Sequence, residues 1–202
     1  MPHPGPTGLF DSGMGGLSVM REVRSLLPSE AIAGMGPAVK AAVAATRNGR
    51  VGVLTTTVTR HGECLASLLR RYTQGVEVFS LPSAGLVERV EAGHADTAET
   101  EAWLRHLLVP LVEARVDALV LGSTYYPFLR PAIQRIVGPE VAVIDTGQAV
   151  ARQTRRILEE KDLLNPNGRP ARETFYTSGE PAAVGAVLAQ LWGRAVPLHS
   201  HD

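Results

Sequence analysis

Three polar turns in the sequence contain the residue types that could do chemistry, and each directly follows a short apolar run. The first, at residues 10–19, reads Phe-Asp-Ser-Gly-Met-Gly-Gly-Leu-Ser-Val and places Asp11 and Ser12 before three glycines. Glycines let a backbone turn sharply and present amide N–H groups at a helix N-terminus, where a carboxylate or phosphate can bind. The spacing is not that of a dinucleotide-binding fingerprint, and the lysine of a P-loop is missing. A helix cap with a flexible turn uses the same residue types, so this alternative stays open.

The second turn, at residues 121–127, reads Leu-Gly-Ser-Thr-Tyr-Tyr-Pro and contains Ser123, Thr124 and Tyr125. Pro127 stands where it can open the next helix. The stretch is not the Gly-x-Ser-x-Gly elbow of serine hydrolases and has no histidine nearby, so it does not indicate a hydrolase. The competing interpretation is a helix N-cap with aromatic packing around it.

The third turn, at residues 54–59, reads Leu-Thr-Thr-Thr-Val-Thr, and its polar run begins at Thr55. Threonine hydroxyls at a strand end can bind a carboxylate or an amine, although they more often cap the following helix. His61 and Cys64 lie three residues apart on an expected helix with no third group to orient them, so a Cys–His nucleophile is not favoured. Asp145 is interpreted either as the cap of the next helix or as part of a cleft between two lobes.

Short apolar runs alternate with stretches of helical period along the chain, and this alternation predicts the elements that position the turns. We expect strands at residues 8–10, 51–55, 76–79, 117–121, 141–144 and 173–176. We expect helices at residues 17–27, 60–72, 97–114, 127–137, 147–160 and 181–192, and an Ala-rich helix after Pro37. The pattern favours an α/β protein with a doubly wound, mostly parallel sheet, in which ligands bind at the carboxyl ends of strands.

Composition narrows the possible partners. Twenty basic and twenty acidic side chains cancel in a chain of 202 residues, which argues against a dedicated nucleic-acid binder. One cysteine excludes an intramolecular disulfide and a multi-thiolate zinc site, and no metal site is expected. The first residues do not resemble a signal peptide, and no apolar run approaches the roughly 18 residues of a membrane span. We therefore expect a soluble cytoplasmic protein with no membrane or nucleic-acid partner.

Taken together, the segments resemble glutamate racemases of the cofactor-independent aspartate/glutamate racemase superfamily. Residues 10–19 are similar to the family's N-terminal substrate-binding turn, and residues 34–40, Gly-Met-Gly-Pro-Ala-Val-Lys, to the turn that opens its second lobe. Residues 83–93 are similar to a segment deeper in that lobe. Residues 121–133 stand where the family has its second catalytic cysteine motif, and residues 144–145 match its return to the first lobe.

The resemblance implies two pseudo-symmetric, doubly wound parallel-sheet lobes. The first would comprise residues 1–33 and 146–202 and would be truncated, and the second would comprise residues 34–145. It also implies a cofactor-free isomerase that interconverts L- and D-glutamate for peptidoglycan precursor synthesis. The partners implied are glutamate or a related small dicarboxylate, and a second copy of the chain in a homodimer.

The departures from the family pattern concern the catalytic groups. The segment that carries the family's first catalytic cysteine and a Pro-Tyr-Gly substrate loop is missing between the first helix and residue 34. This accounts for the lack of a second strand before residue 51. In the second motif Ser123 replaces the cysteine and Tyr125 replaces the histidine. The resemblance assigns catalytic positions to Asp11, Ser123 and Tyr125 and substrate-contact positions to Asp11, Ser12, Thr55 and Thr124, and Gly36 replaces a family acidic residue.

These replacements predict a severe loss of turnover. Inversion at an α-carbon needs a base on one face and an acid on the other, and thiols serve well because they ionise near neutrality. A serine hydroxyl is a poor base without a group to take its proton, and a tyrosine phenol ionises only near about pH 10. Two alternatives stay open. The chain could be a non-catalytic module that binds a dicarboxylate or a protein partner, or a fragment whose exposed apolar surface drives association.

Overall fold

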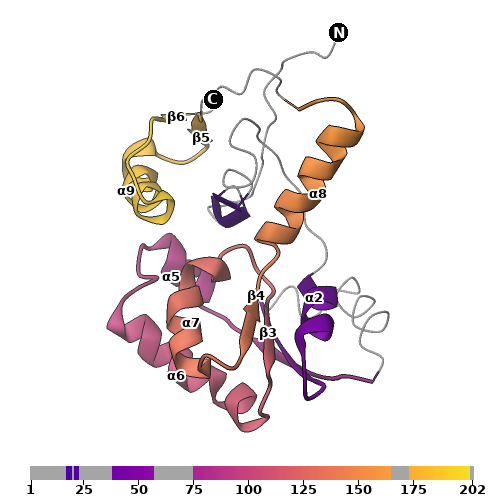
Figure 1. The fold of residues 1–202 in the computed structure, drawn as a ribbon. Coiled ribbons are helices and arrows are strands. Elements are labelled where there is room, and N and C mark those ends of the chain that lie inside the picture. The colour runs from indigo at the N-terminus through magenta and orange to yellow at the C-terminus, as the bar shows by residue number, and fades with distance from the viewer. Residues whose placement is uncertain (1–16, 20, 23–37, 57–74, 165–172, 201–202) are drawn as a thin grey trace. The chain divides into compact units, whose positions relative to one another are not determined.

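The structure is a computed structural model that describes residues 17–19, 21–22, 38–56, 75–164 and 173–200 (Figure 1). The chain divides into two compact units. One, here called the terminal unit, comprises residues 1–35, 91–93 and 147–202, and the other, the sheet unit, comprises residues 36–90 and 94–146. The expected strand at 8–10 and the expected helix at 60–72 lie outside the described residues, as do Asp11, Ser12, Gly36, His61 and Cys64.

The sheet unit is built on four parallel strands in the order β2-β1-β3-β4. Their bounds are β1 Arg50–Thr55, β2 Glu77–Pro82, β3 Ala118–Leu121 and β4 Ala142–Ile144. The two central strands, β1 and β3, are buried along almost their whole length, as expected for runs of Val and Leu in a parallel sheet covered on both faces. The expected parallel α/β architecture is confirmed.

Helices cover both faces of this sheet. Their bounds are α2 Ala38–Ala45, α5 Leu86–Glu91, α6 Ala98–Glu113, the 3₁₀ turn η1 Tyr126–Leu129 and α7 Arg130–Val137. Ala38 and Ala42 of α2 pack in one cluster with Val51 and Val53, while α6 and α7 lie on the other side of the sheet in Figure 1. A Cβ at Gly52 would lie 3.2 Å from Leu111 of α6, so the small residue permits close helix packing.

Local sequence signals explain where these helices begin and end. Thr97 caps α6, because its hydroxyl oxygen accepts a hydrogen bond from the Thr100 amide at 3.2 Å. Glu99 and Glu101 occupy the first turn, where negative charge favours the helix dipole. Helix α7 ends at Gly138, whose φ of 86° few residues other than glycine adopt.

The terminal unit contains a two-stranded parallel sheet and two long helices. Their bounds are α8 Gly147–Glu160, β5 Phe175–Thr177, α9 Pro181–Trp192 and β6 Leu198–Ser200, with residues 17–19 and 21–22 also helical. Val19 packs with Val150, Ala151 and Leu158 in the described part of this unit's core. None of the helices in the described ranges combines the length with the apolar composition that a membrane span requires.

Most expected elements within the described residues are present. The helices expected at 147–160 and 181–192 are found with those bounds, and the helix expected at 97–114 is found at 98–113. The helix expected at 127–137 is divided into η1 and α7. Helix α5 and strand β6 were not predicted, because six and three residues are too short to show a hydrophobic period.

Candidate functional site

The carboxyl edge of the four-stranded sheet gathers the described residues that the sequence singled out. Because all four strands run in the same direction, the turns that follow them meet at this edge. We define the carboxyl edge as residues 55–56, 82–83, 121–126 and 144–145. Ser123, Thr124 and Tyr125 follow β3 here and are half-buried, Thr55 ends β1, and Asp145 follows β4.

Gly122 starts the turn that carries the three candidate residues. Its amide donates to the Leu54 carbonyl at 2.8 Å, and a Cβ at this position would lie 2.6 Å from the same oxygen. Only glycine therefore fits where the turn crosses β1. Within the turn, the Ser123 carbonyl accepts from the Tyr126 amide at 3.2 Å and the Ser123 Oγ accepts from the Tyr125 amide at 3.4 Å. The serine hydroxyl thus supports the backbone of its own turn.

Thr55 is completely buried, and its polar atoms are directed to the neighbouring strand β2. Its Oγ1 lies 3.5 Å from the Leu81 carbonyl oxygen, and its own carbonyl accepts from the Ser83 amide at 2.8 Å. Thr56, the next residue, is half-buried. A substrate contact from Thr55 stays a prediction, and the partly exposed side chain at this strand end is that of Thr56.

Two buried residues complete the edge and were missed by the analysis of motifs. The Tyr126 hydroxyl lies 2.6 Å from the Ser83 Oγ, and the Ser83 hydroxyl lies 2.8 Å from the Thr55 carbonyl oxygen. Burial raises the pKa of the Tyr126 phenol above its usual value, which outweighs the opposing effect of its hydrogen bond with Ser83. The signal was available, because Ser83 is the first residue after β2 and therefore lies at the same edge.

Asp145 carries the one carboxylate of the carboxyl edge. It forms an ion pair with Arg130 at the start of α7, and Arg130 also donates to the Val143 carbonyl at 2.6 Å. The Asp145 side chain is 12% exposed and that of Arg130 is 36% exposed. The guanidinium therefore compensates the negative charge where the sheet ends.

The chemistry available at this edge is that of hydroxyl groups. Within residues 55–56, 82–83, 121–126 and 144–145 there is no cysteine, histidine or lysine, and the single carboxylate is paired. Hydroxyls both donate and accept hydrogen bonds, so they can orient a carboxylate or an ammonium group. They do not ionise near neutral pH. Among the residues that the structure describes, no group of three or more His, Cys, Asp or Glu could hold a metal ion.

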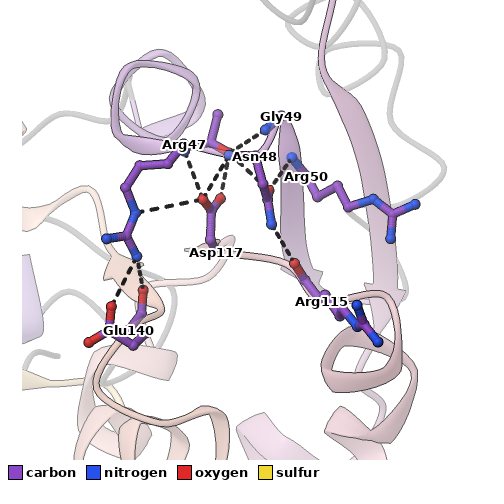
Figure 2. A network of polar contacts seen from close by, with 8 residues as sticks. Arg47, Asn48, Gly49, Arg50, Arg115, Asp117 and Glu140 are labelled. Atoms are coloured by element: carbon purple, nitrogen blue, oxygen red, sulfur yellow. Dashed lines mark hydrogen bonds and ion pairs between the residues drawn. The ribbon is translucent and has the colours of Figure 1, made fainter.

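A second polar cluster lies at the opposite, amino edge of the sheet (Figure 2). Asp117, just before β3, accepts hydrogen bonds from the Thr46 hydroxyl and from the amides of Arg47 at 2.7 Å and Asn48 at 3.0 Å. Asn48 in turn donates to the Arg115 carbonyl at 2.8 Å. Burial alone would raise the pKa of Asp117, but these hydrogen bonds outweigh it and hold that pKa below its usual value. Every partner is supplied by the protein itself, so we assign this cluster to stability.

Comparisons with known proteins agree with one another. The family model described as Asp/Glu/hydantoin racemase matches residues 18–154. The glutamate racemase of Pseudomonas paraeruginosa is 38% identical over 250 positions, covering 93% of this chain and 94% of the relative. That of Pseudomonas entomophila is 45% identical, covering 87% of this chain and 66% of the relative. Two solved structures of glutamate racemases are similar in fold. That from Bacillus anthracis has a TM-score of 0.86 and 23% sequence identity, and the match covers 100% of this chain and 98% of that chain. That from Thermus thermophilus has a TM-score of 0.78 and 26% sequence identity, and the match covers 98% of both chains.

The alignment with the Pseudomonas paraeruginosa protein also shows how much shorter this chain is. It runs over 250 positions, whereas 93% of 202 residues is about 188, so about 60 positions are filled in the relative and empty here. That these positions form one segment missing between the first helix and residue 34 stays a prediction.

Proposed function

This chain belongs to the glutamate racemase family, and we propose that it binds glutamate or a related small dicarboxylate while its turnover is lost or strongly impaired. The family activity behind this proposal is the interconversion of L- and D-glutamate without a cofactor, for peptidoglycan precursors in the cytoplasm. Solved relatives from Francisella tularensis and Escherichia coli are complexes with D-glutamate and L-glutamate, respectively. These complexes support glutamate as the first ligand to test.

The observation that carries the proposal is the composition of the turn after β3. Ser123 occupies the position where the family resemblance places a catalytic cysteine, and its Oγ accepts a hydrogen bond from the Tyr125 amide. No imidazole, thiol or unpaired carboxylate lies among residues 55–56, 82–83, 121–126 and 144–145 to take the serine proton. Each missing general acid or base costs about two to four orders of magnitude in rate.

Binding is proposed to survive because it needs hydrogen-bond donors and acceptors rather than proton carriers. We assign Thr124 and Thr55 of the sheet unit, with Asp11 and Ser12 of the N-terminal turn, to contacts with the ligand. Asp11, Ser123 and Tyr125 are the residual candidates for proton transfer. The division into a truncated first lobe (1–33 and 146–202) and a second lobe (34–145), and a homodimer, belong to the same proposal.

Circular dichroism of the purified protein with L- or D-glutamate tests turnover directly. We expect the ellipticity to stay constant, and we expect no exchange of the α-hydrogen in deuterium oxide by NMR. The glutamate racemase of Pseudomonas paraeruginosa, assayed in parallel, provides the positive control. Clear racemisation that disappears in the Ser123→Ala variant would contradict the proposal, whereas activity that persists at an equal level in that variant identifies contaminating host enzyme.

A restoration experiment tests the role of the missing segment. Ser123→Cys combined with Tyr125→His returns the family residues to the turn after β3. We expect no recovery of racemisation, because the opposite face of the substrate still lacks its base. Recovery would show that another residue of this chain supplies that base.

Thermal unfolding in the presence of ligand tests binding. Glutamate at about 100 times its Kd should stabilise the protein by about 2.7 kcal/mol, and alanine, which lacks the side-chain carboxylate, should not. If neither enantiomer of glutamate raises Tm at high concentration, a dicarboxylate site is excluded. The alternative, a module that binds a protein partner, would then be the better description.

A further inference from the structure

A line of hydrogen bonds crosses three strand ends at the carboxyl edge. It runs from Tyr126, after β3, to Ser83, after β2, and ends on the carbonyl of Thr55 in β1. In the sheet, β1 lies between β2 and β3, so the hydrogen bonds connect the ends of all three neighbouring strands. We call these three residues the hydroxyl relay.

The direction of each hydrogen bond follows from the groups involved. The Thr55 carbonyl can only accept, so the Ser83 hydroxyl donates its single hydrogen to it over 2.8 Å. Ser83 then has no hydrogen left for Tyr126, so the phenol donates to the Ser83 Oγ over 2.6 Å. The Tyr126 phenol can donate to Ser83 only because the Ser83 hydroxyl donates to Thr55. Hydrogen bonds linked in this way polarise one another.

The relay and Gly122 hold the two ends of one turn on neighbouring residues of β1. At the start of the turn, the Gly122 amide donates to the Leu54 carbonyl at 2.8 Å. At its end, Tyr126 reaches the next carbonyl, that of Thr55, through Ser83. Residues 123–125 lie between these two anchors, so their position relative to β1 is determined by both.

The burial of the relay makes it a rigid support. Ser83 is 2% exposed and Tyr126 is completely buried, so water does not compete for their hydroxyls. No buried side-chain nitrogen or oxygen among the described residues lacks a partner, and the relay is therefore fully satisfied.

We propose that Ser83 and Tyr126 are positioning residues, which set the affinity for glutamate by fixing residues 123–125 over the end of β1. This inference rests on the proposed function, because it assumes that the same turn contacts the ligand. Ser83 and Tyr126 act through Thr124 and Ser123 and make no contact with the ligand of their own. Their hydroxyls, rather than their bulk, carry the effect.

Calorimetric titration with D-glutamate tests the inference in four variants. Tyr126→Phe removes the donor at almost unchanged volume and should weaken binding about fivefold, the size of one net hydrogen bond. Ser83→Val should weaken it at least as much, whereas Ser83→Thr keeps the hydroxyl and should restore most of the affinity. Tyr176→Phe, at a 64% exposed tyrosine of the terminal unit, is the matched control and should leave the Kd unchanged.

The outcomes separate the inference from the proposed function. If Tyr126→Phe and Ser83→Val lower Tm but keep the parent Kd, the relay is only structural and the inference is overturned. If the parent protein binds no glutamate, the proposed function fails. The amide chemical shifts of Thr124 and Tyr125 then still test positioning: we expect them to move in Tyr126→Phe and to stay in Tyr176→Phe. Unchanged shifts in Tyr126→Phe would overturn the inference.

Discussion

The two edges of the four-stranded sheet are held by different chemical groups. At each edge, hydrogen bonds connect a turn to strands that are distant in sequence. At the amino edge, Asp117 carries a negative charge that accepts hydrogen bonds from Thr46, Arg47 and Asn48 (Figure 2). At the carboxyl edge, the neutral hydroxyls of Ser83 and Tyr126 form the corresponding hydrogen bonds. The carboxylate is 12% exposed, and the phenol is completely buried.

The difference follows from what each edge has to leave available. A buried carboxylate with several donors holds a loop firmly, but its charge would repel a dicarboxylate ligand nearby. The carboxyl edge has one carboxylate, Asp145, and Arg130 compensates it. Neutral hydroxyls fix the backbone there without adding charge. We infer that the amino edge serves stability alone, while the carboxyl edge combines stability with recognition.

Gly122→Ala, at the carboxyl edge, should destabilise the protein more than any other substitution considered below. The new Cβ would lie 2.6 Å from the Leu54 carbonyl oxygen, which belongs to backbone that cannot move aside cheaply. We expect a loss of about 3 kcal/mol in the free energy of unfolding. For a chain of this size, Tm should fall by roughly 6 to 12 °C, measured by thermal melting.

Gly185→Ala provides the control for this substitution. Gly185 lies inside α9, and a Cβ there would meet no atom within 4 Å. Alanine should therefore stabilise the helix by about 0.5 to 1 kcal/mol through its higher helix propensity. If both substitutions changed stability by the same small amount, the close crossing of the turn over β1 would be refuted.

Asp117→Asn should weaken the amino edge, and the effect should depend on pH. At neutral pH we expect a loss of about 2 kcal/mol, because an amide cannot accept hydrogen bonds with both of its polar atoms. The folded-state pKa of Asp117 is lowered, so the ionised carboxylate stabilises the fold above its unfolded pKa of about 3.9. This contribution is lost as the pH falls through the folded-state pKa.

Denaturant titration at neutral pH and at about pH 3 measures the difference in unfolding free energy between the parent protein and Asp117→Asn. The difference in unfolding free energy should narrow at the lower pH, since the parent then begins to lose its charge. Because other carboxylates titrate in both proteins, the difference isolates Asp117. A gap of equal size at both pH values would mean that the charge contributes nothing.

Tyr126→Phe should lower the free energy of unfolding by about 1 kcal/mol. Unlike the loss in Asp117→Asn, this loss should be the same from mildly acidic to mildly alkaline pH. The pKa of this phenol is raised in the folded state, so its stabilising contribution is complete below the unfolded pKa of about 10. It is lost only as the pH rises through the folded-state pKa. Denaturant titrations across this range check the prediction. A loss that varies with pH below about 8 would contradict the distinction between charged and neutral edges.

The fold was predictable where the sequence has length or an uninterrupted apolar character. Helix α8 shows its period over 14 residues, and the buried strands β1 and β3 are short runs of Val and Leu. Strand β6 has three residues with only partial burial, so its sequence has no distinctive pattern. Its place in a sheet depends on pairing with β5, which no local signal specifies.

The candidate site was predictable to the same extent. Ser123, Thr124 and Tyr125 were found because they directly follow a strong apolar strand. The contact between Ser83 and Tyr126 joins residues 43 apart and depends on the strand order β2-β1-β3. That order cannot be deduced from a local pattern. Asp117 was expected within a strand, and its role as an acceptor depends on the return of residues 46–48 to the same edge.

Arg47→Ala gives the smallest expected effect and the sharpest test of how the amino edge works. The Arg47 guanidinium lies 4.0 Å from Asp117 and 3.2 Å from Glu140, but its side chain is 68% exposed. Solvent screens such a pair, so we expect a loss of no more than about 0.5 kcal/mol, vanishing at about 1 M salt. The Arg47 amide donates to Asp117 whatever the side chain is, and alanine keeps it. A loss as large as that of Asp117→Asn would show that ion pairs, rather than backbone and hydroxyl donors, hold this edge.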